Sequence, residues 1–404
     1  MCARFSAGAG FFLFGLSLAF FIFGCGKDGD VRLASGWESA QVRQVANAEV
    51  LPDEPAVASD EAGAAPAYDY EGWVVGWSGY EEKRHAVIYH DDHGQWIKEE
   101  LLPFDSVSFL EDVAFPEADN GWAVGGFDAG PDYQALLLHR DGTGWSRVEI
   151  PELRCTNFIK VEFTDADHGW ALCGYVLGNK PLAYHYSEGL WERVPEAGLL
   201  PFVKLNEMAL LADDQVYISG VVPDAGGYGL LLNYSGGVLT DIMSGRPFGW
   251  FEGLHIAAPN DGYLADCGWK LSFFDPVIYH YDGVSWTEEA GIARGACVAE
   301  FARAPGGAWY GAAYNGKPLL IQKSGKAWTV MDIPPGHIGG SMSGLHDLAF
   351  PADDFGVAVG EGSGGTPWGR QGYAIRYNGA QWQRIPALMS RAESYRGVSY
   401  VTSP

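Results

Sequence analysis

Apolar and polar positions alternate in short runs along most of the chain, and the runs return at a fixed distance. Each repeat has an alternating run, a turn with Asp or Asn, and a Gly–aromatic pair, as in Val113–Phe115, Asp119–Asn120 and Gly121–Trp122. Alternation of period two predicts half-buried strands, and Asx residues are typical of tight turns. The aromatic position recurs roughly every 46–49 residues. Its seven copies are Trp73, Trp122, Trp170, Tyr217, Tyr263, Trp309 and the apolar Val357.

The second half of each repeat predicts a hairpin. An apolar run leads to a Gly turn and then to a Trp, as in His280–Trp286, which reads HYDGVSW. Asp-Gly between apolar runs is a strong hairpin signal because both residues tolerate positive φ. The seven hairpins reach Trp96, Trp145, Trp191, Leu239, Trp286, Trp328 and Trp382. Four short strands in each of seven repeats predict an all-β fold, a seven-bladed β-propeller.

The two ends of the repeat array predict how the ring closes. The first repeat lacks the strand that should precede Trp73, and Val398–Tyr400 matches Val113–Phe115 of the second repeat. We expect this C-terminal strand to complete blade one, because a closed ring has no open sheet edges.

The N-terminal segment differs from the repeats and predicts export. Phe11–Phe23 is an apolar run of 13 residues, which is short for a membrane span. It leads to Gly24 and Cys25, which resembles a bacterial lipoprotein signal with Cys25 as the lipidated residue. Ordinary signal cleavage or an uncleaved anchor are the alternatives. We therefore expect a signal at 1–24, the lipid-anchor Cys and a flexible linker at 25–68, and the propeller at 69–404.

Charge narrows the range of partners. The net charge is −25, and no Lys/Arg cluster stands out. Such a surface repels nucleic acid and anionic lipid headgroups, so we expect no nucleic acid partner and membrane contact only through the N-terminal lipid. The expected location is the bacterial cell envelope, lipid-anchored and either periplasmic or surface-exposed, and the expected state is a monomer.

Cysteine usage fits an exported protein. Cys2 would be lost with the signal, which leaves four Cys besides Cys25. We predict the disulfides Cys155–Cys173 and Cys267–Cys297, because short loops cost less entropy to close. The other two connectivities stay open at this point, and free buried thiols are the alternative.

The sequence offers no catalytic or metal motif that outweighs a structural explanation, so no cofactor, metal or catalytic residue is predicted. His90, His139, His185 and His280 occupy one slot in different blades, which would hold them apart around the ring. The Asp-rich turns lack the ligand spacing of a calcium loop. Arg384–Pro386 matches the Arg-Ile-Pro motif of sialidases, but the repeat itself explains it.

The Asp…Gly-Trp-Ala-Val-Gly strand and the Tyr-Asp-Gly…Trp hairpin carry a family resemblance. They resemble the repeats of the photosystem assembly factor family and of sialidase-like, Asp-box propellers, and above all bacterial lipoproteins built from such repeats. The resemblance implies the propeller fold over about residues 70–404 and leaves function open, because propellers host many functions. We expect a non-enzymatic binding or scaffolding module for a protein or a glycan. The alternative is a glycan-active hydrolase or lyase.

Variable loops predict where binding occurs. Connections between the second and third strands of a blade, and from one blade to the next, emerge on one face and differ in length and content. Variation on a fixed scaffold is how repeat folds acquire ligand sites. The alternative is that these side chains only cover the blade ends. The candidate binding residues are Trp77, Tyr80, Tyr133, Trp269, Phe273, Trp368 and Arg370.

Overall fold

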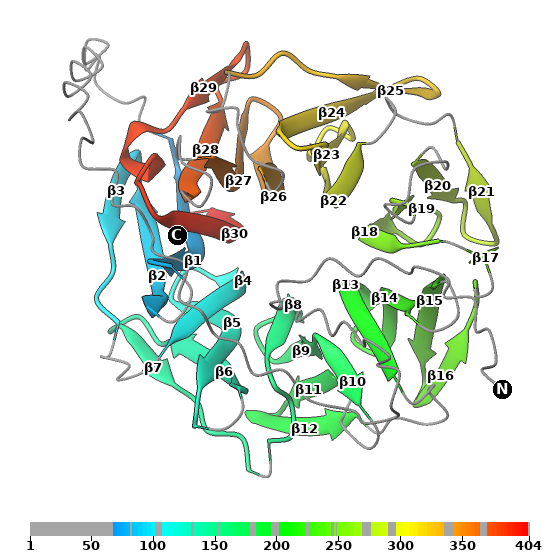
Figure 1. Cartoon of the computed structure of the whole chain (residues 1–404), viewed down its shortest axis with the longest axis horizontal. Coiled ribbons are helices and arrows are strands. Elements are labelled where there is room, and N and C mark those ends of the chain that lie inside the picture. Colours follow the sequence, from blue (N-terminus) through cyan, green and yellow to red (C-terminus); the bar gives the residue numbers. More distant parts are fainter. Residues whose placement is uncertain are drawn as a thin grey trace, which may run out of the picture. The chain divides into compact units, whose positions relative to one another are not determined.

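The computed structural model describes most of the chain after residue 67. The described ranges are 68–80, 83–101, 107–130, 133–151, 153–177, 183–194, 202–223, 227–243, 246–247, 249–268, 276–289, 296–334, 343–363 and 370–402. Cys25, Trp269, Phe273 and Trp368 lie outside them. Figure 1 shows the described strands as seven sheets around a central axis, a seven-bladed β-propeller. Within this described part, no helix is long and apolar enough to cross a bilayer.

The four main strands of each blade follow one another from the axis outward. The innermost strands, from blade one to blade seven, are β30 (Glu393–Thr402), β4 (Ser108–Glu117), β8 (Phe158–Asp165), β13 (Phe202–Ala212), β18 (Phe251–Ala258), β22 (Cys297–Arg303) and β26 (Gly344–Ala352). The second strands are β1 (Tyr70–Ser78), β5 (Asn120–Asp128), β9 (His168–Cys173), β14 (Gln215–Val222), β19 (Asp261–Asp266), β23 (Trp309–Tyr314) and β27 (Phe355–Ser363).

The third and fourth strands complete the blades. The third strands are β2 (His85–Asp92), β6 (Tyr133–Arg140), β11 (Ala183–Ser187), β15 (Tyr228–Ser235), β20 (Val277–Tyr281), β24 (Pro318–Ser324) and β28 (Arg370–Tyr377). The fourth strands are β3 (Gln95–Lys98), β7 (Trp145–Arg147), β12 (Leu190–Val194), β16 (Val238–Asp241), β21 (Trp286–Glu288), β25 (Ala327–Val330) and β29 (Trp382–Arg384). Blade four also holds β10 (Tyr175–Leu177) and β17 (Arg246–Pro247), and the short 3-10 helix η3 (Pro386–Leu388) precedes β30.

The two glycines of the repeat motif have separate packing roles. A Cβ on Gly121 would lie 2.2 Å from the Phe115 ring, so this glycine makes room for the aromatic residue of the inner strand. A Cβ on Gly125 would lie 2.0 Å from the carbonyl oxygen of Phe109, so the second glycine lets the inner-strand backbone approach. The motif therefore encodes how the first two strands of a blade fit together.

The apolar core lies between blades. Each of the core clusters in the described residues joins two consecutive blades. One of them joins Trp73 and Val75 of blade one to Leu110 and Val113 of blade two, and another joins blades seven and one. Because a single blade is too thin to bury both of its faces, stability depends on the closed ring.

The C-terminal strand closes the ring, as the sequence predicts. Strand β30 pairs antiparallel with β1, with Val398 opposite Val74 and Tyr400 opposite Gly72. The buried carboxylate of Asp91 accepts hydrogen bonds of 2.6 Å from the hydroxyls of both Tyr68 and Tyr400. The first and last described segments are thus tied to one side chain.

The repeated His residues and the four Cys have structural roles. His90 stacks on Trp73 at 4.6 Å, and His139 lies 4.2 Å from Trp122, so each imidazole covers the repeat aromatic of its own blade. His185 and His280 make the same kind of contact in blades three and five. The cysteines form Cys155–Cys173 and Cys267–Cys297, which confirms the predicted pairing.

Candidate functional site

Every inner strand carries a β-bulge at the same level of the ring. At this level the pairing register with the second strand shifts in every blade, for example between Leu110 and Asp112 in β4 and between Leu345 and Asp347 in β26, and five blades have a second shift nearer the other end of the strand. A bulge inserts one extra residue and re-aims its side chain. The bulged residues are Glu111, Ile159, Asn206, Glu252 with Gly253, Ala299, His346 and Arg396.

The bulges surround a pocket of about 400 Å³ at the mouth of the central channel. A bulged residue from each of the seven blades lines it. Asn157, which precedes an inner strand, and Gly174 and Tyr314, which end or follow second strands, also line it. The pocket therefore lies on the face that carries the blade-to-blade connections and the loops after the second strands. We call it the channel mouth.

A second ring is formed by the residue after the bulge in six blades and by Gly253, the second bulged residue, in blade five. Five of these residues are charged and two are glycine. The seven, from blade one to blade seven, are Gly397, Asp112, Lys160, Glu207, Gly253, Glu300 and Asp347. A Cβ on Gly397 would lie 2.7 Å from the Cα of Asp112, so glycine there makes room for the next blade.

Two of the acids in this second ring bind the neighbouring blade. Asp112 Oδ2 accepts a hydrogen bond of 2.9 Å from the Val161 amide, and Asp347 Oδ2 accepts one of 2.7 Å from the Val398 amide. The second bond crosses the closure between blades seven and one. The closure is therefore built like the joint between blades two and three.

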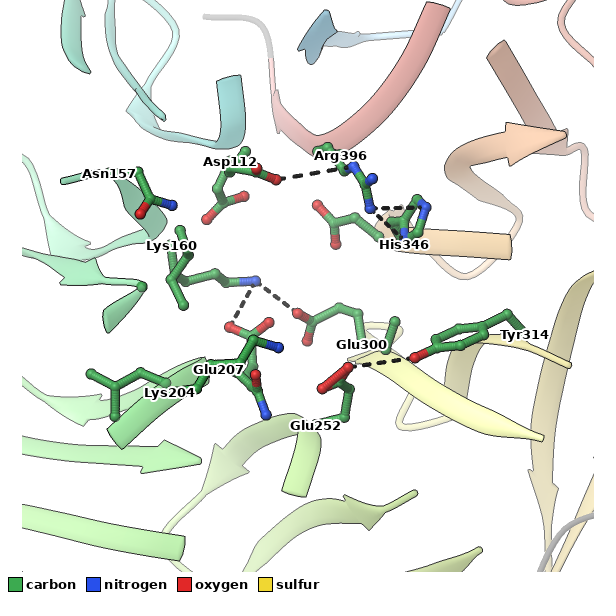
Figure 2. A pocket seen from close by; sticks show the side chains of 17 residues that line it. Asp112, Asn157, Lys160, Lys204, Glu207, Glu252, Glu300, Tyr314, His346 and Arg396 are labelled. Atoms are coloured by element: carbon green, nitrogen blue, oxygen red, sulfur yellow. Dashed lines mark hydrogen bonds and ion pairs between the residues drawn. The ribbon is translucent and has the colours of Figure 1, made fainter. Parts of the chain in front are cut away.

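Lys160 is the central cation of the channel mouth. Figure 2 shows its side chain reaching toward Glu207 and Glu300. Its Nζ lies 2.7 Å from Glu300 Oε2 and 3.2 Å from Glu207 Oε1. These contacts link blades three, four and six through groups that are each less than a fifth exposed. Such a buried pair is costly to break, because the remaining charges lose their compensation.

Burial controls the protonation of this ring. Burial raises the pKa of Asp112 to about 6 and that of Asp347 to about 8. Burial and the adjacent Glu300 charge raise the pKa of Glu207 well above its usual range. Burial opposes the charge on Lys160, but the surrounding carboxylates hold its pKa well above the ordinary lysine value. The ammonium is therefore retained while part of the ring carries protons.

One edge of the channel mouth is rich in arginine. The Arg396 guanidinium lies 4.6 Å from the Trp77 ring centroid and 3.8 Å from Glu361, and Arg370 lies 3.4 Å from Glu361. Burial would raise the pKa of Glu361, but a hydrogen bond with His346 and the charges of both arginines lower it to about 2. Burial and Arg396 lower the pKa of His346 to about 4, so the imidazole is neutral.

The opposite edge holds a lysine, a tryptophan and a glutamate from blades four and five. Lys204 Nζ lies 4.7 Å from the Trp250 ring centroid. Trp250 Nε1 donates to Glu252 Oε2 at 2.8 Å, and the Tyr314 hydroxyl donates to Glu252 Oε1 at 3.4 Å. Lys204, Glu252 and Tyr314 line the channel mouth.

Four of the sequence-predicted binding residues are described. Trp77 is only 3% exposed and lies in strand β1, where it packs against Phe109 at 6.2 Å and lies beneath Arg396 and Arg370. Tyr133 contacts the same Phe109 at 5.8 Å, so the structure brings Trp77, Tyr133 and Arg370 close to one edge of the mouth. Tyr80 and Tyr133 are 48% and 43% exposed. Trp77 is a packed residue rather than an open aromatic surface.

The two rings of the channel mouth are not among the sites predicted from the sequence. The sequence signal for them is a charged residue inside an otherwise apolar inner strand, such as Asp112 directly before Val113 and Asp347 directly before Leu348. A charged residue in an otherwise apolar strand is informative because burying it requires a partner.

The fold and the charged channel mouth define a β-propeller with a candidate ligand site on its axis. No protein-family model matches the chain, and no curated protein matches it. A solved structure of a protein from Lactobacillus plantarum is 14% identical, with a TM-score of 0.54 over 82% of this chain and 99% of that one.

Two further solved structures are similar to this chain over most of its length. A puromycin-hydrolyzing peptidase from Mycobacterium tuberculosis is 11% identical, with a TM-score of 0.50 over 79% of this chain and 52% of that one. YCF48 from Cyanidioschyzon merolae is 16% identical, with a TM-score of 0.48 over 72% and 89%. At such low identity, the likeness to the Lactobacillus plantarum protein and to the peptidase extends to the fold and no further.

Proposed function

We propose that the chain is a non-enzymatic binding propeller that takes its protein or glycan partner at the channel mouth. The observation that carries this proposal is the pocket of about 400 Å³ lined by a bulged residue from every blade. Bulges are enriched beside functional sites because they re-aim side chains, and concave sites on a fold's axis are common ligand sites. The charged lining favours an ionic segment of a protein over a neutral glycan.

A glycan-active hydrolase or lyase is the rival function. Carboxyl groups with raised pKa values, such as Asp112 and Asp347, are what a general acid requires. However, both accept hydrogen bonds from backbone amides, and Glu207 and Glu300 hold Lys160. Arg396 and Arg370 are paired with Glu361. These engagements support structural roles for the acids and therefore favour the binding module.

The experiment is a quantitative pull-down from an envelope extract with the mature protein and two variants. Ala299 lines the mouth, and Ala327 is exposed on the outer strand of the same blade. Ala299→Trp should fill the pocket and lower the amount of partner recovered by at least tenfold. Ala327→Trp should recover as much partner as the unchanged protein. Circular dichroism checks that both variants fold. Loss from both variants, or from neither, contradicts binding at the mouth.

We also propose export to the cell envelope with a lipid on Cys25. The apolar run before Gly24-Cys25 and the two disulfides support this location, since disulfides persist in oxidising compartments. Cys25→Ala should release the protein from membrane fractions. An unmodified Cys25 in the native protein, found by mass spectrometry, would rule the anchor out.

A further inference from the structure

Most charged side chains that line the channel mouth form an ion pair or accept a hydrogen bond within the protein. Lys160 has Glu207 and Glu300, and Arg396 has Glu361 and Glu111. Asp112 and Asp347 accept hydrogen bonds from backbone amides of the next blade. These groups explain how the ring is held and leave little charge for a ligand.

Lys204 and Glu252 are different. Among the residues that the structure describes, Lys204 has no carboxylate and Glu252 has no cation within ion-pair distance. Both line the mouth and are half-buried. Half-burying a charge without a counter-charge costs free energy unless a ligand or water compensates the charge.

Both side chains are nevertheless held in place. The Trp250 ring supports the Lys204 ammonium at 4.7 Å, and the Trp250 indole N–H donates to Glu252 at 2.8 Å. The Tyr314 hydroxyl donates to the other oxygen of Glu252. One indole thus positions a cation on its face and a carboxylate on its edge, and neutral donors fix the carboxylate without cancelling its charge.

We propose that Lys204 and Glu252 form a subsite for a zwitterionic ligand, whose carboxylate binds Lys204 and whose ammonium or guanidinium binds Glu252. This inference rests on the proposed function and names the chemistry that the mouth selects. A ligand that carries both charges forms an ion pair with each side chain at once. A ligand that carries one charge pairs with one side chain and leaves the other without a counter-charge. The same chemistry is offered by neighbouring acidic and basic residues of a polypeptide and by a free amino acid.

Titration calorimetry with small probes tests the subsite directly. The probes are capped tetrapeptides that carry adjacent Lys and Asp, Lys and Asn, Gln and Asp, or Gln and Asn, together with free glycine and free lysine. The Lys–Asp peptide should bind the wild type about tenfold more tightly than either singly charged peptide, since one charged contact is worth roughly a factor of ten. Binding of the free amino acids alone would assign the subsite to a solute rather than to a polypeptide.

Charge-removing variants separate the two contacts. Glu252→Gln should abolish the preference for Lys in the probe, and Lys204→Met should abolish the preference for Asp. The charge-conserving Lys204→Arg should keep the selectivity. Matched controls are Lys326→Met, in an exposed hairpin of blade six, and Glu149→Gln, which is 76% exposed beside Arg147. Both controls should bind like the wild type.

Three results would overturn the subsite. One is measurable but equal affinity of the wild type for all four peptides, and another is no binding of any probe, free amino acids included. The third is unchanged selectivity in both Glu252→Gln and Lys204→Met. Each of these results leaves the proposed function standing if Ala299→Trp still removes the partner in the pull-down. Loss of that effect as well would remove both.

Discussion

The inner strands and the outer hairpins of the same blades use repetition in opposite ways. The outer hairpins repeat their residues, so that His90 and His139 cover Trp73 and Trp122 in the same manner. The inner strands repeat their geometry, a bulge and the residue after it, but change the side chain from blade to blade. Constant residues maintain the blade, and variable residues at a constant position create a site.

Removing an inner strand should lower the free energy of unfolding more than any other change considered below. Deleting residues 395–404 removes most of β30, including the buried Tyr395 and Val398, the Asp347–Val398 bond and the Tyr400–Asp91 bond. We expect a loss of more than about 5 kcal/mol, which is the whole stability of many domains. Thermal unfolding followed by circular dichroism measures it. An unchanged midpoint would exclude closure by β30.

Removing the central cation should have the next largest effect. Lys160→Met leaves Glu207 and Glu300 buried without a counter-charge, and breaking such a pair costs about 3–5 kcal/mol. Chemical denaturation at pH 8 measures the loss. A variant as stable as the wild type at that pH would contradict the central role of Lys160.

The loss in Lys160→Met should depend on pH. A carboxyl whose folded pKa is raised, such as that of Glu207, binds its proton more tightly in the folded state. The stability that this group contributes is therefore fully present below the ordinary glutamate pKa. It is lost as the pH rises through the raised pKa of the folded state. The deficit of the variant should be smallest near pH 4.5 and should grow toward pH 8. A deficit that shrinks as the pH rises would contradict burial as its cause.

A change in an outer repeat should have the smallest effect. His139→Ala removes the contact with Trp122 and the hydrogen bond with Asn120 at 3.0 Å. We expect a loss of about 1 kcal/mol in the free energy of unfolding, typical of one aromatic pair, and no change in partner binding. Denaturant unfolding and the pull-down check both halves. A loss of partner with the fold intact would place function on the outer hairpins.

The same contrast explains what the sequence could predict. Trp122, Gly121 and the hairpin Trp145 mark strands because their roles need the same residue in nearly every blade, and local spacing suffices to find them. The closing strand and both disulfides also followed from spacing and count. Local chemistry is readable from one sequence because its partners are near in the chain.

The channel mouth was not readable in this way. The position after the bulge changes from Asp112 to Lys160 to Glu207 in successive blades, so a search for repeated residues finds no pattern there. The Lys160–Glu300 contact joins residues 140 positions apart, and only ring closure brings them together. The loop aromatics Trp269 and Trp368 lie outside the described residues, so their role stays a prediction.

Site-specific photo-crosslinking tests whether the partner binds at the channel mouth. A photoreactive amino acid is placed at Ala299 in the mouth, at Ala327 on the outer edge of the same blade, or at Asp119 in an Asp-rich turn on the opposite face. If the partner binds at the channel mouth, it should cross-link from position 299 at least tenfold more than from position 327 or 119. Cross-linking from position 119 or 327 in preference to 299 would contradict binding there.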